Sequence, residues 1–505
     1  MTIRRLNLLT IITINLFIAI CIQKYSIADN SFDVSEIGEA FTGGTGTVFV
    51  KNKNAYSLPL KNIRTENRIN FFVGNSMFRR VWLPPSTLHE AKDGLGPFFN
   101  ADSCQNCHIN DGRGHPPSLS WPGDDAISLV IALAIPPQNE FEKKQLETFQ
   151  IKSFPDPNYG SQLSDFATEG VMPEGKVMIE YDYFPIAFDN GKVVNLRKPN
   201  FSISNLKYGK LHPDIQISAR IAQPIIGLGL IEGISDRDIL MNVDPNDKDK
   251  DGVSGKANRV RNEITDELVL GRFGWKASQP SILQQTIDAL YHDMGLSSTF
   301  SSQSNNCSKI QIDCQSVATG NSADYDNVEV SNEQIDLMIF YQKHLSPPGR
   351  RDVNNKEVLK GKKIFFESGC NSCHVQKFTT SRDIENPSLS EQVIWPYSDF
   401  LLHNMGEDLA DNLSEFNATG SEWRTPPLWG IGLTNVVNGH TNFLHDGRAQ
   451  NILEAILWHG GEAENSKNKI LKLSLSEVDQ LVSCLLYTSD AADDLLCVDL
   501  GGRRI

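Results

Sequence analysis

The sequence predicts a mainly α-helical protein with irregular loops and a small β-containing insertion, and three observations support this fold class. Apolar residues recur at helical spacing in two stretches, residues 281–294 and 331–345. Glycine and proline are dense in much of the remaining chain, which is typical of irregular backbone. Alternation of apolar and polar residues, which is typical of a strand, is found at residues 175–205.

Composition indicates a globular, acidic protein. The chain has 505 residues, of which 40% are hydrophobic and 22% are charged, and its formal net charge is −15. This length and apolar content suffice for more than one hydrophobic core. The acidic balance argues against nucleic acid as a partner.

The first 28 residues predict a signal peptide. Arg4 and Arg5 precede an apolar run over residues 8–22, and Ser-Ile-Ala at residues 26–28 offers a cleavage site of small residues. An uncleaved membrane anchor is the alternative, but the apolar run is short for a membrane-spanning helix. We therefore expect an exported, periplasmic protein without stable membrane insertion after cleavage.

The motif Cys-x-x-Cys-His occurs twice, as Cys104, Cys107 and His108 and again as Cys370, Cys373 and His374. Residues three apart on a helical turn share a face, so the two sulfurs can bond the two vinyl groups of one porphyrin. The adjacent histidine is then placed as the proximal iron ligand. The sequence therefore predicts two covalently bound c-type haems.

Two further cysteines fit an oxidising compartment. Cys307 and Cys314 lie seven residues apart in a polar loop and predict a disulfide. A catalytic dithiol is the alternative interpretation, but the Cys-x-x-Cys spacing of reactive thiol pairs is absent here.

An acidic segment resembles a calcium loop. Asp247, Asp249 and Asp251 occupy the first, third and fifth positions, and Gly252 occupies the sixth. The twelfth position holds Asn258 instead of the bidentate glutamate of an EF-hand. Calcium binding and a plain acidic turn are both compatible with this pattern.

Local signals define the elements between the two motifs. Within residues 175–205, the turn signal Asp-Asn-Gly at 189–191 predicts a β-hairpin. The helix predicted at 281–294 carries an apolar stripe and ends at Gly295. The helix predicted at 331–345 begins with a capping box of Ser331 and Gln334.

The segment Pro347–Asn355 is predicted to be a linker into a C-terminal module. That module has a helix leading into the second haem motif, a loop-rich middle, and closing helices near 452–458 and from about 476, which is the plan of cytochrome c. We therefore expect two cytochrome c-like haem domains, the first of which contains the β insertion. The predicted division is a signal peptide at 1–28, an N-terminal haem domain at 29–350 and a C-terminal domain at 351–483.

Residues 484–505 interrupt the last predicted helix without a stop signal. They resemble translated sequencing-adapter read-through, so we interpret them as a non-native tail and exclude them from fold prediction.

The motifs as a set resemble the di-haem oxidoreductase family, whose members include peroxidases and so-called thiol oxidoreductases. The family is related to the bacterial di-haem cytochrome c peroxidases. The resemblance extends over about residues 65–482 and is carried by segments 74–117, 159–166, 227–232, 247–260, 271–277, 293–295, 402–406, 422–429, 445–448 and 458–461. It implies a periplasmic redox protein with two c-type haems, a small electron-donor protein (a cytochrome c or a cupredoxin) and a small-molecule oxidant.

The sixth ligand of each haem iron decides whether that haem transfers electrons or reacts with a substrate, because a substrate can bind iron only where the sixth coordination position is open. For the second haem the resemblance points to His459, since a His-x-Gly element, here at His445, precedes that ligand by fourteen residues in the related peroxidases. A surface histidine is the alternative. For the first haem the candidates are Met294, Met405, His115 and Met77, with core packing as the alternative for Met294.

Three classes of function follow. The first is an oxidoreductase that reduces a substrate, with hydrogen peroxide implied by the resemblance, using an acid–base group near the first motif such as Glu90, Asp93 or Gln105. The second is an electron carrier with both haems six-coordinate, and the third is a binding module that keeps haem for stability. Candidate bridges between the haems are Trp82, Trp275 and Trp395.

Overall fold

The computed structural model describes residues 32, 34–85, 92–117, 128–301 and 305–486. The predicted signal peptide, Glu90 and most of the predicted non-native tail lie outside these residues. Within the described ranges, no helix is both long enough and apolar enough to cross a membrane.

The prediction of a mainly α fold built from two cytochrome c-like domains is wrong. The structure has 29% helix and 19% strand, and its strands form several small sheets. Only the predicted β-containing insertion fits. Ladders of two or three residues, such as the pairing of Leu402–Asn404 with Glu422–Arg424, are too short for alternation to show in the sequence.

Helices occupy the following residues: α2 Arg68–Phe78, α3 Cys104–Cys107, α4 Glu140–Glu147, α5 Leu228–Glu232, α6 Asp236–Leu240, α7 Ile282–Met294, α8 Ile312–Gln315, α9 Asn332–His344, α10 Lys356–Glu367, α11 Thr434–Asn438, α12 Ile452–Leu457, α13 Glu464–Ile470 and α14 Leu475–Leu486. The predicted helices at 281–294 and 331–345 are confirmed as α7 and α9. Gly295 ends α7 with a positive φ of 64°, and the capping box of Ser331 and Gln334 starts α9.

Among the described residues, every pair of named strands is antiparallel. The longest is β5 (Lys176–Ala187) with β6 (Val193–Ser204), which confirms the hairpin predicted at 175–205. In a three-stranded sheet, β2 (Leu129–Ala134) lies between β3 (Gln162–Leu163) and β7 (Gln216–Ile221). The small sheets pair β1 (Phe98–Phe99) with β4 (Phe166–Ala167), β8 (Arg259–Arg261) with β9 (Leu268–Leu270), β10 (Phe378–Thr379) with β11 (Val393–Ile394), and β12 (Leu402–Asn404) with β13 (Glu422–Arg424).

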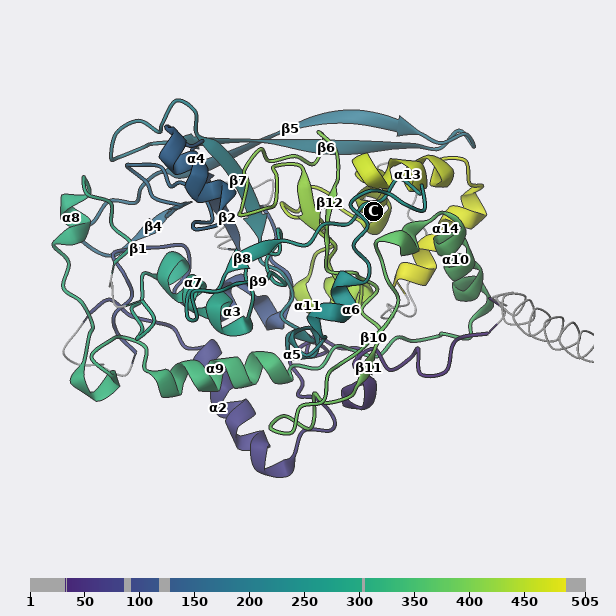
Figure 1. The fold of residues 1–505 in the computed structure, drawn as a ribbon, viewed down its shortest axis with the longest axis horizontal. Helices are drawn as coiled ribbons and strands as arrows, with labels where there is room; N and C mark the ends of the chain where they lie inside the picture. The colour runs from purple at the N-terminus through teal and green to yellow at the C-terminus, as the bar shows by residue number, and fades with distance from the viewer. Residues whose placement is uncertain (1–31, 33, 86–91, 118–127, 302–304, 487–505) are drawn as a thin grey trace, which may run out of the picture.

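The hairpin of β5 and β6 connects the two halves of the chain. It runs along one edge of the molecule, from the region of β2 and β7 towards α13 (Figure 1). Phe184 packs edge-on against Trp458 with ring centroids 5.3 Å apart. Arg197 donates hydrogen bonds to the carbonyls of Arg448 and Gly447, at 2.9 and 3.1 Å. The insertion is therefore anchored in the C-terminal part of the chain.

Residues of the predicted linker are packed against the N-terminal segment. Gly349 N donates to Val48 O and Arg350 N donates to Ala40 O, each at 3.0 Å. The largest hydrophobic core also draws on both sides of the predicted boundary at residue 350, since it joins β2 to α10 and α14. Both halves of the chain therefore share one core.

Close helix contacts depend on glycine. A Cβ atom at Gly361 of α10 would lie 1.9 Å from the carbonyl oxygen of Gln480 in α14, and one at Gly74 of α2 would lie 2.1 Å from that of Leu337 in α9. No larger side chain fits at either position without moving a helix. Of the first pair, α10 leads directly into the second haem motif, and of the second pair, α2 ends at Phe78, whose ring centroid lies 6.1 Å from that of His108 in the first motif.

Candidate haem sites

The first Cys-x-x-Cys-His motif opens into a cavity of about 540 Å³. Cys104 and Cys107 begin and end the short helix α3, and neither is part of a disulfide. The Nδ1 atom of His108 lies 2.7 Å from the carbonyl oxygen of Gln223. Burial lowers the pKa of His108, so the ring is neutral and its other nitrogen, Nε2, is available as a metal ligand.

The second motif lines a separate cavity of about 180 Å³, in which Cys370 and Cys373 are again free thiols. His374 Nδ1 lies 2.8 Å from the carbonyl oxygen of Tyr397, and burial lowers the pKa of His374 to about 4. The same cavity is lined by His459, whose Nδ1 lies 2.8 Å from the carbonyl oxygen of Ala455. Both histidines therefore leave Nε2 available for iron.

An unpaired cation supports the fit of haem to both cavities. Arg113 is buried and lines each of them. Its Nε atom has no hydrogen-bond partner, and among the described residues no carboxylate forms an ion pair with it. Burial lowers the pKa of Arg113 to about 10, so the guanidinium is still charged at neutral pH. Such a group requires an anion, and a haem propionate is one.

Trp275 also borders both cavities. Its indole Nε1 donates to Ile221 O at 2.9 Å, which fixes the ring between the two sites. Trp82 and Trp395, the other predicted bridges, are buried in hydrophobic clusters and line neither cavity.

A second indole forms part of the wall of the second cavity alone. Trp423 stacks on His445 with ring centroids 3.8 Å apart, and the Lys276 ammonium lies 4.0 Å from the centroid of Trp423. Burial lowers the pKa of Lys276 to about 8, against the effect of Asp411 at 3.1 Å. A buried cation on an aromatic face makes removal of an electron from that ring harder.

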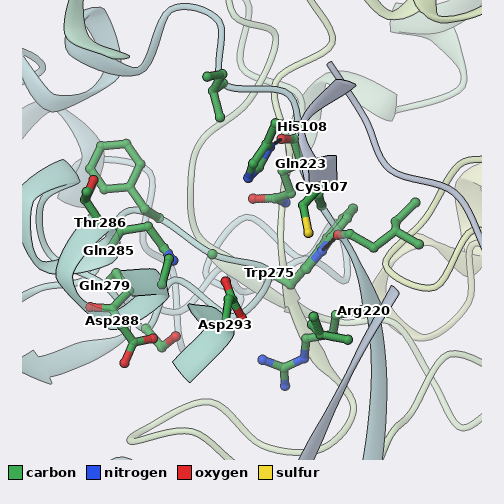
Figure 2. A pocket seen from close by; sticks show the side chains of 18 of the residues that line it. Cys107, His108, Arg220, Gln223, Trp275, Gln279, Gln285, Thr286, Asp288 and Asp293 are labelled. Carbon is green, nitrogen blue, oxygen red and sulfur yellow. Dashed lines mark hydrogen bonds between the residues drawn. The ribbon is translucent and has the colours of Figure 1, made fainter. Parts of the chain in front are cut away.

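Polar side chains face His108 across the first cavity. Figure 2 shows Gln285, Thr286, Gln279 and Asp288 on the side away from His108 and Cys107, with Asp293 between the two groups. Burial raises the pKa of Asp293 to about 6, although Gln162 donates a hydrogen bond to it at 2.7 Å. These residues were not predicted, because the apolar stripe of α7 was the only periodic signal considered in that segment. Residues 285, 286, 289 and 293, which lie beside that stripe on the helix, were the signal available.

The structure distributes the predicted sixth ligands between the sites. Met294 lines the first cavity and is also part of an apolar cluster with Leu290 and Leu296. Met405 lines the second cavity rather than the first, for which it was predicted. Met77 and His115 line neither cavity.

The acid–base groups predicted near the first motif lie elsewhere. Asp93 and Gln105 do not line the cavity, and Glu90 lies outside the described residues.

The predicted disulfide between Cys307 and Cys314 is formed.

The three aspartates of the predicted calcium loop are brought together. Ligand atoms of Asp247, Asp249 and Asp251 lie within 4.8 Å of one another. Asn258, at the twelfth position, points elsewhere and donates to Lys276 O at 2.8 Å. Asp251 accepts a hydrogen bond from Ser372, inside the second haem motif, at 2.8 Å. Calcium binding stays a prediction.

Comparison with known protein families gives one match that covers most of the chain. A family model described as "Di-haem oxidoreductase, putative peroxidase" matches residues 37–487. A search of curated proteins found no match. The matched range contains both Cys-x-x-Cys-His motifs and all the residues that line the two cavities.

Proposed function

The chain belongs to the di-haem oxidoreductase family, and on that premise we propose that it is an exported peroxidase with two c-type haems. A small donor protein, a cytochrome c or a cupredoxin, delivers electrons to the second haem, and the first haem reduces hydrogen peroxide. The Cys307–Cys314 disulfide supports export, because disulfides persist in oxidising compartments.

The second haem is the electron-transfer site. His374 and His459 line one small cavity, and each is anchored through Nδ1, so their Nε2 atoms would be free to hold the iron of a bound haem. Met405 offers a sulfur in the same cavity and is the alternative to His459. A haem held by two protein ligands would transfer electrons without binding a substrate.

The observation that carries the peroxidase proposal is the difference between the two cavities. The first is about 540 Å³ against about 180 Å³, and its far wall carries Gln285, Thr286 and Asp293 instead of a second anchored histidine. His292 also lines it, but its ring nitrogens face Asp288 at 3.4 Å and Ser161 at 3.5 Å. This cavity leaves room for a small polar substrate.

Asp293 is the proposed general acid–base group for the reduction of peroxide. When bound, haem supplies the iron that binds peroxide and exchanges electrons with it. Asp293 is ionised at neutral pH, accepts a proton from one peroxide oxygen and returns it to the other as the oxygen–oxygen bond breaks. Gln162 holds the carboxylate in place through its hydrogen bond.

Trp275 is the proposed route for electrons between the two haems. It borders both cavities, and the Arg113 guanidinium lies 5.9 Å from its ring centroid, whereas the Lys276 ammonium lies only 4.0 Å from that of Trp423. Trp275 is therefore the easier indole to use for electron transfer between the haems.

The optical spectrum of the half-reduced protein tests the assignment. We expect one low-spin haem that becomes high-spin in His459→Ala, while Met405→Leu leaves the spectrum unchanged. Wild-type protein is expected to consume peroxide in the presence of a reduced small cytochrome. Two low-spin haems in every redox state, with peroxide untouched, would identify an electron carrier whose first haem is closed by Met294.

A further inference from the structure

One phenylalanine separates His108 from a buried tyrosine. The ring centroid of Phe78, at the end of α2, lies 6.1 Å from that of His108 and 5.5 Å from that of Tyr341 in α9. Tyr341 is 0% exposed, and its hydroxyl donates a hydrogen bond to Oδ1 of Asp111 at 2.7 Å. A continuous contact chain therefore runs from the proposed iron ligand to a phenol that has its own proton acceptor.

Asp111 is suited to receive that proton. The carboxyl group is buried, and no arginine or lysine among the described residues forms an ion pair with it. Ser57 and Tyr341 donate hydrogen bonds to it. A carboxylate that already accepts the hydrogen bond of the Tyr341 phenol is placed to take up its proton.

The second site repeats this arrangement. The ring centroid of Phe365 lies 6.0 Å from that of His374 and 6.1 Å from that of Tyr397. The hydroxyl of Tyr397 donates to Oε1 of Glu39 at 3.0 Å. Each proposed proximal histidine therefore has a phenylalanine, a buried tyrosine and a buried carboxylate in the same order.

The charges around the two tyrosines differ. Arg350 donates to the Tyr397 hydroxyl at 2.7 Å and lies 5.3 Å over its ring. Arg350 and Lys362 also pair with Glu39. These cations oppose both the loss of an electron by Tyr397 and the arrival of a proton on Glu39. Arg79 acts electrostatically on both Tyr341 and Asp111. Among the described residues, however, no arginine or lysine donates a hydrogen bond to the Tyr341 hydroxyl, so Tyr341 is the easier phenol to oxidise.

We propose that Tyr341 is a redox-active residue, which gives one electron to the first haem and holds the missing electron as a neutral tyrosyl radical. The inference rests on the proposed reaction with peroxide, which is the oxidant. Peroxide takes up two electrons, and two protons from solvent, as its oxygen–oxygen bond breaks and two waters form. Without a donor protein, Tyr341 supplies one of these electrons, and the other would come from the bound haem. The Tyr341 O–H bond breaks, and its proton moves along the hydrogen bond to Asp111, which becomes the neutral acid.

The experiment uses the haem-loaded full chain, mixed with one equivalent of hydrogen peroxide without a donor and frozen rapidly. Electron paramagnetic resonance is recorded in the free-radical region, on protein grown with ring-deuterated and with ordinary tyrosine. We expect a radical signal whose lines narrow on deuteration, a loss of this signal in Tyr341→Phe and a weaker signal in Asp111→Asn. Tyr397→Phe is the matched control, because it also removes one buried hydroxyl, and it is expected to keep the signal.

Peroxide consumption in the same samples separates the two proposals. If peroxide is consumed while Tyr341→Phe keeps the wild-type tyrosyl signal, or while Tyr397→Phe loses it, the assignment to Tyr341 is overturned and the peroxidase proposal stands. If wild-type protein leaves peroxide unconsumed, the proposed function fails, and the role of Tyr341 fails with it. Optical spectra of each variant show that both haems are attached.

Discussion

At the scale of single residues, the chemistry of the first cavity depends on how burial changes carboxyl groups. Asp293 and Asp288 come from the same helix and line the same cavity. Burial raises the pKa of Asp293 to about 6, whereas Asp288 faces His292 at 3.4 Å. A carboxyl group with a pKa near the working pH can both accept and return a proton. Substitution of Asp293 therefore tests the acid–base role, and substitution of Asp288 is the matched control.

Asp293→Asn should lower kcat/KM for peroxide by about 10²–10⁴-fold, the usual contribution of a general acid–base group. Because the ionised form is the active one, wild-type kcat/KM should rise with pH through about 6, while the variant should show no such rise. Steady-state assays across this pH range measure both effects. Asp288→Asn is the control, and an equal loss in that variant would contradict the assignment.

A second prediction at this scale concerns the buried ion pairs of Glu415 with Arg220 and Lys152, beside the first cavity. Burial disfavours the charged form of Glu415, yet Arg220 and Lys152 hold its pKa at about 2. Since this value lies below the ordinary 4.5, the stabilisation is present above pH 4.5 and is lost as the pH falls towards 2. Glu415→Gln leaves Arg220 without its closest carboxylate.

Glu415→Gln should therefore destabilise the protein by about 3–5 kcal/mol at pH 7, as expected when one partner of a buried ion pair is removed. The difference from wild type should shrink as the pH falls from about 4.5 to about 2. Denaturant unfolding at a series of pH values measures it. Glu267→Gln, at an exposed position, should change the free energy of unfolding by less than about 0.5 kcal/mol.

At the scale of elements, the position of the second haem motif depends on how closely two helices, α10 and α14, pack. Gly361 allows α10, which leads into the second motif, to lie directly on α14. A methyl group there would meet the carbonyl oxygen of Gln480, which is backbone and cannot move away alone. The contact is thus set by the absence of a side chain.

Gly361→Ala should destabilise the protein by about 1–3 kcal/mol, the usual cost of overpacking, although alanine is the better helix former. Lys363→Ala, at an exposed position of the same helix, is the control. Thermal unfolding of the two variants provides the comparison. An unchanged melting temperature in Gly361→Ala would show that the helices do not approach as closely as described.

At the scale of the whole molecule, the β insertion holds the two halves together. Arg197 of β6 donates to the carbonyls of Arg448 and Gly447 and to Asn442 Oδ1 at 3.0 Å, all in the C-terminal part of the chain. Lys198, the next residue on the strand, is partly exposed and lies only 3.9 Å from its nearest carboxylate, Asp408. Of these two neighbouring residues, Arg197 therefore anchors the hairpin to the C-terminal part of the chain, whereas Lys198 contributes little to that contact.

Arg197→Ala should cost about 2–4 kcal/mol, because it removes charged hydrogen bonds and leaves buried carbonyls unpaired. It should also make the hairpin more accessible to limited proteolysis. Lys198→Ala is expected to match wild type in both measurements. If Arg197→Ala behaves like Lys198→Ala, the hairpin is not the connection between the halves.

Comparison of prediction and structure shows which features depend on local sequence. The helices α7 and α9, the hairpin of β5 and β6 and the disulfide were predicted correctly, because each is specified by residues within one short segment. The fold class was wrong, because the small sheets pair segments that carry no local strand signal. Contact between Met405 and the second cavity could not be predicted, since spacing from a motif does not reveal which wall a loop joins.

The amino-acid sequence alone predicts where two haems attach, and determines which histidine follows each pair of cysteines, because attachment requires only neighbours on one helical turn. Only the tertiary structure decided what surrounds them. It joins Tyr341 to Asp111 across 230 residues, leaves the Nε atom of Arg113 without a hydrogen-bond partner among the described residues, and turns polar residues of α7 towards His108. These features come from packing of distant segments, and burial then sets the charges that govern the chemistry.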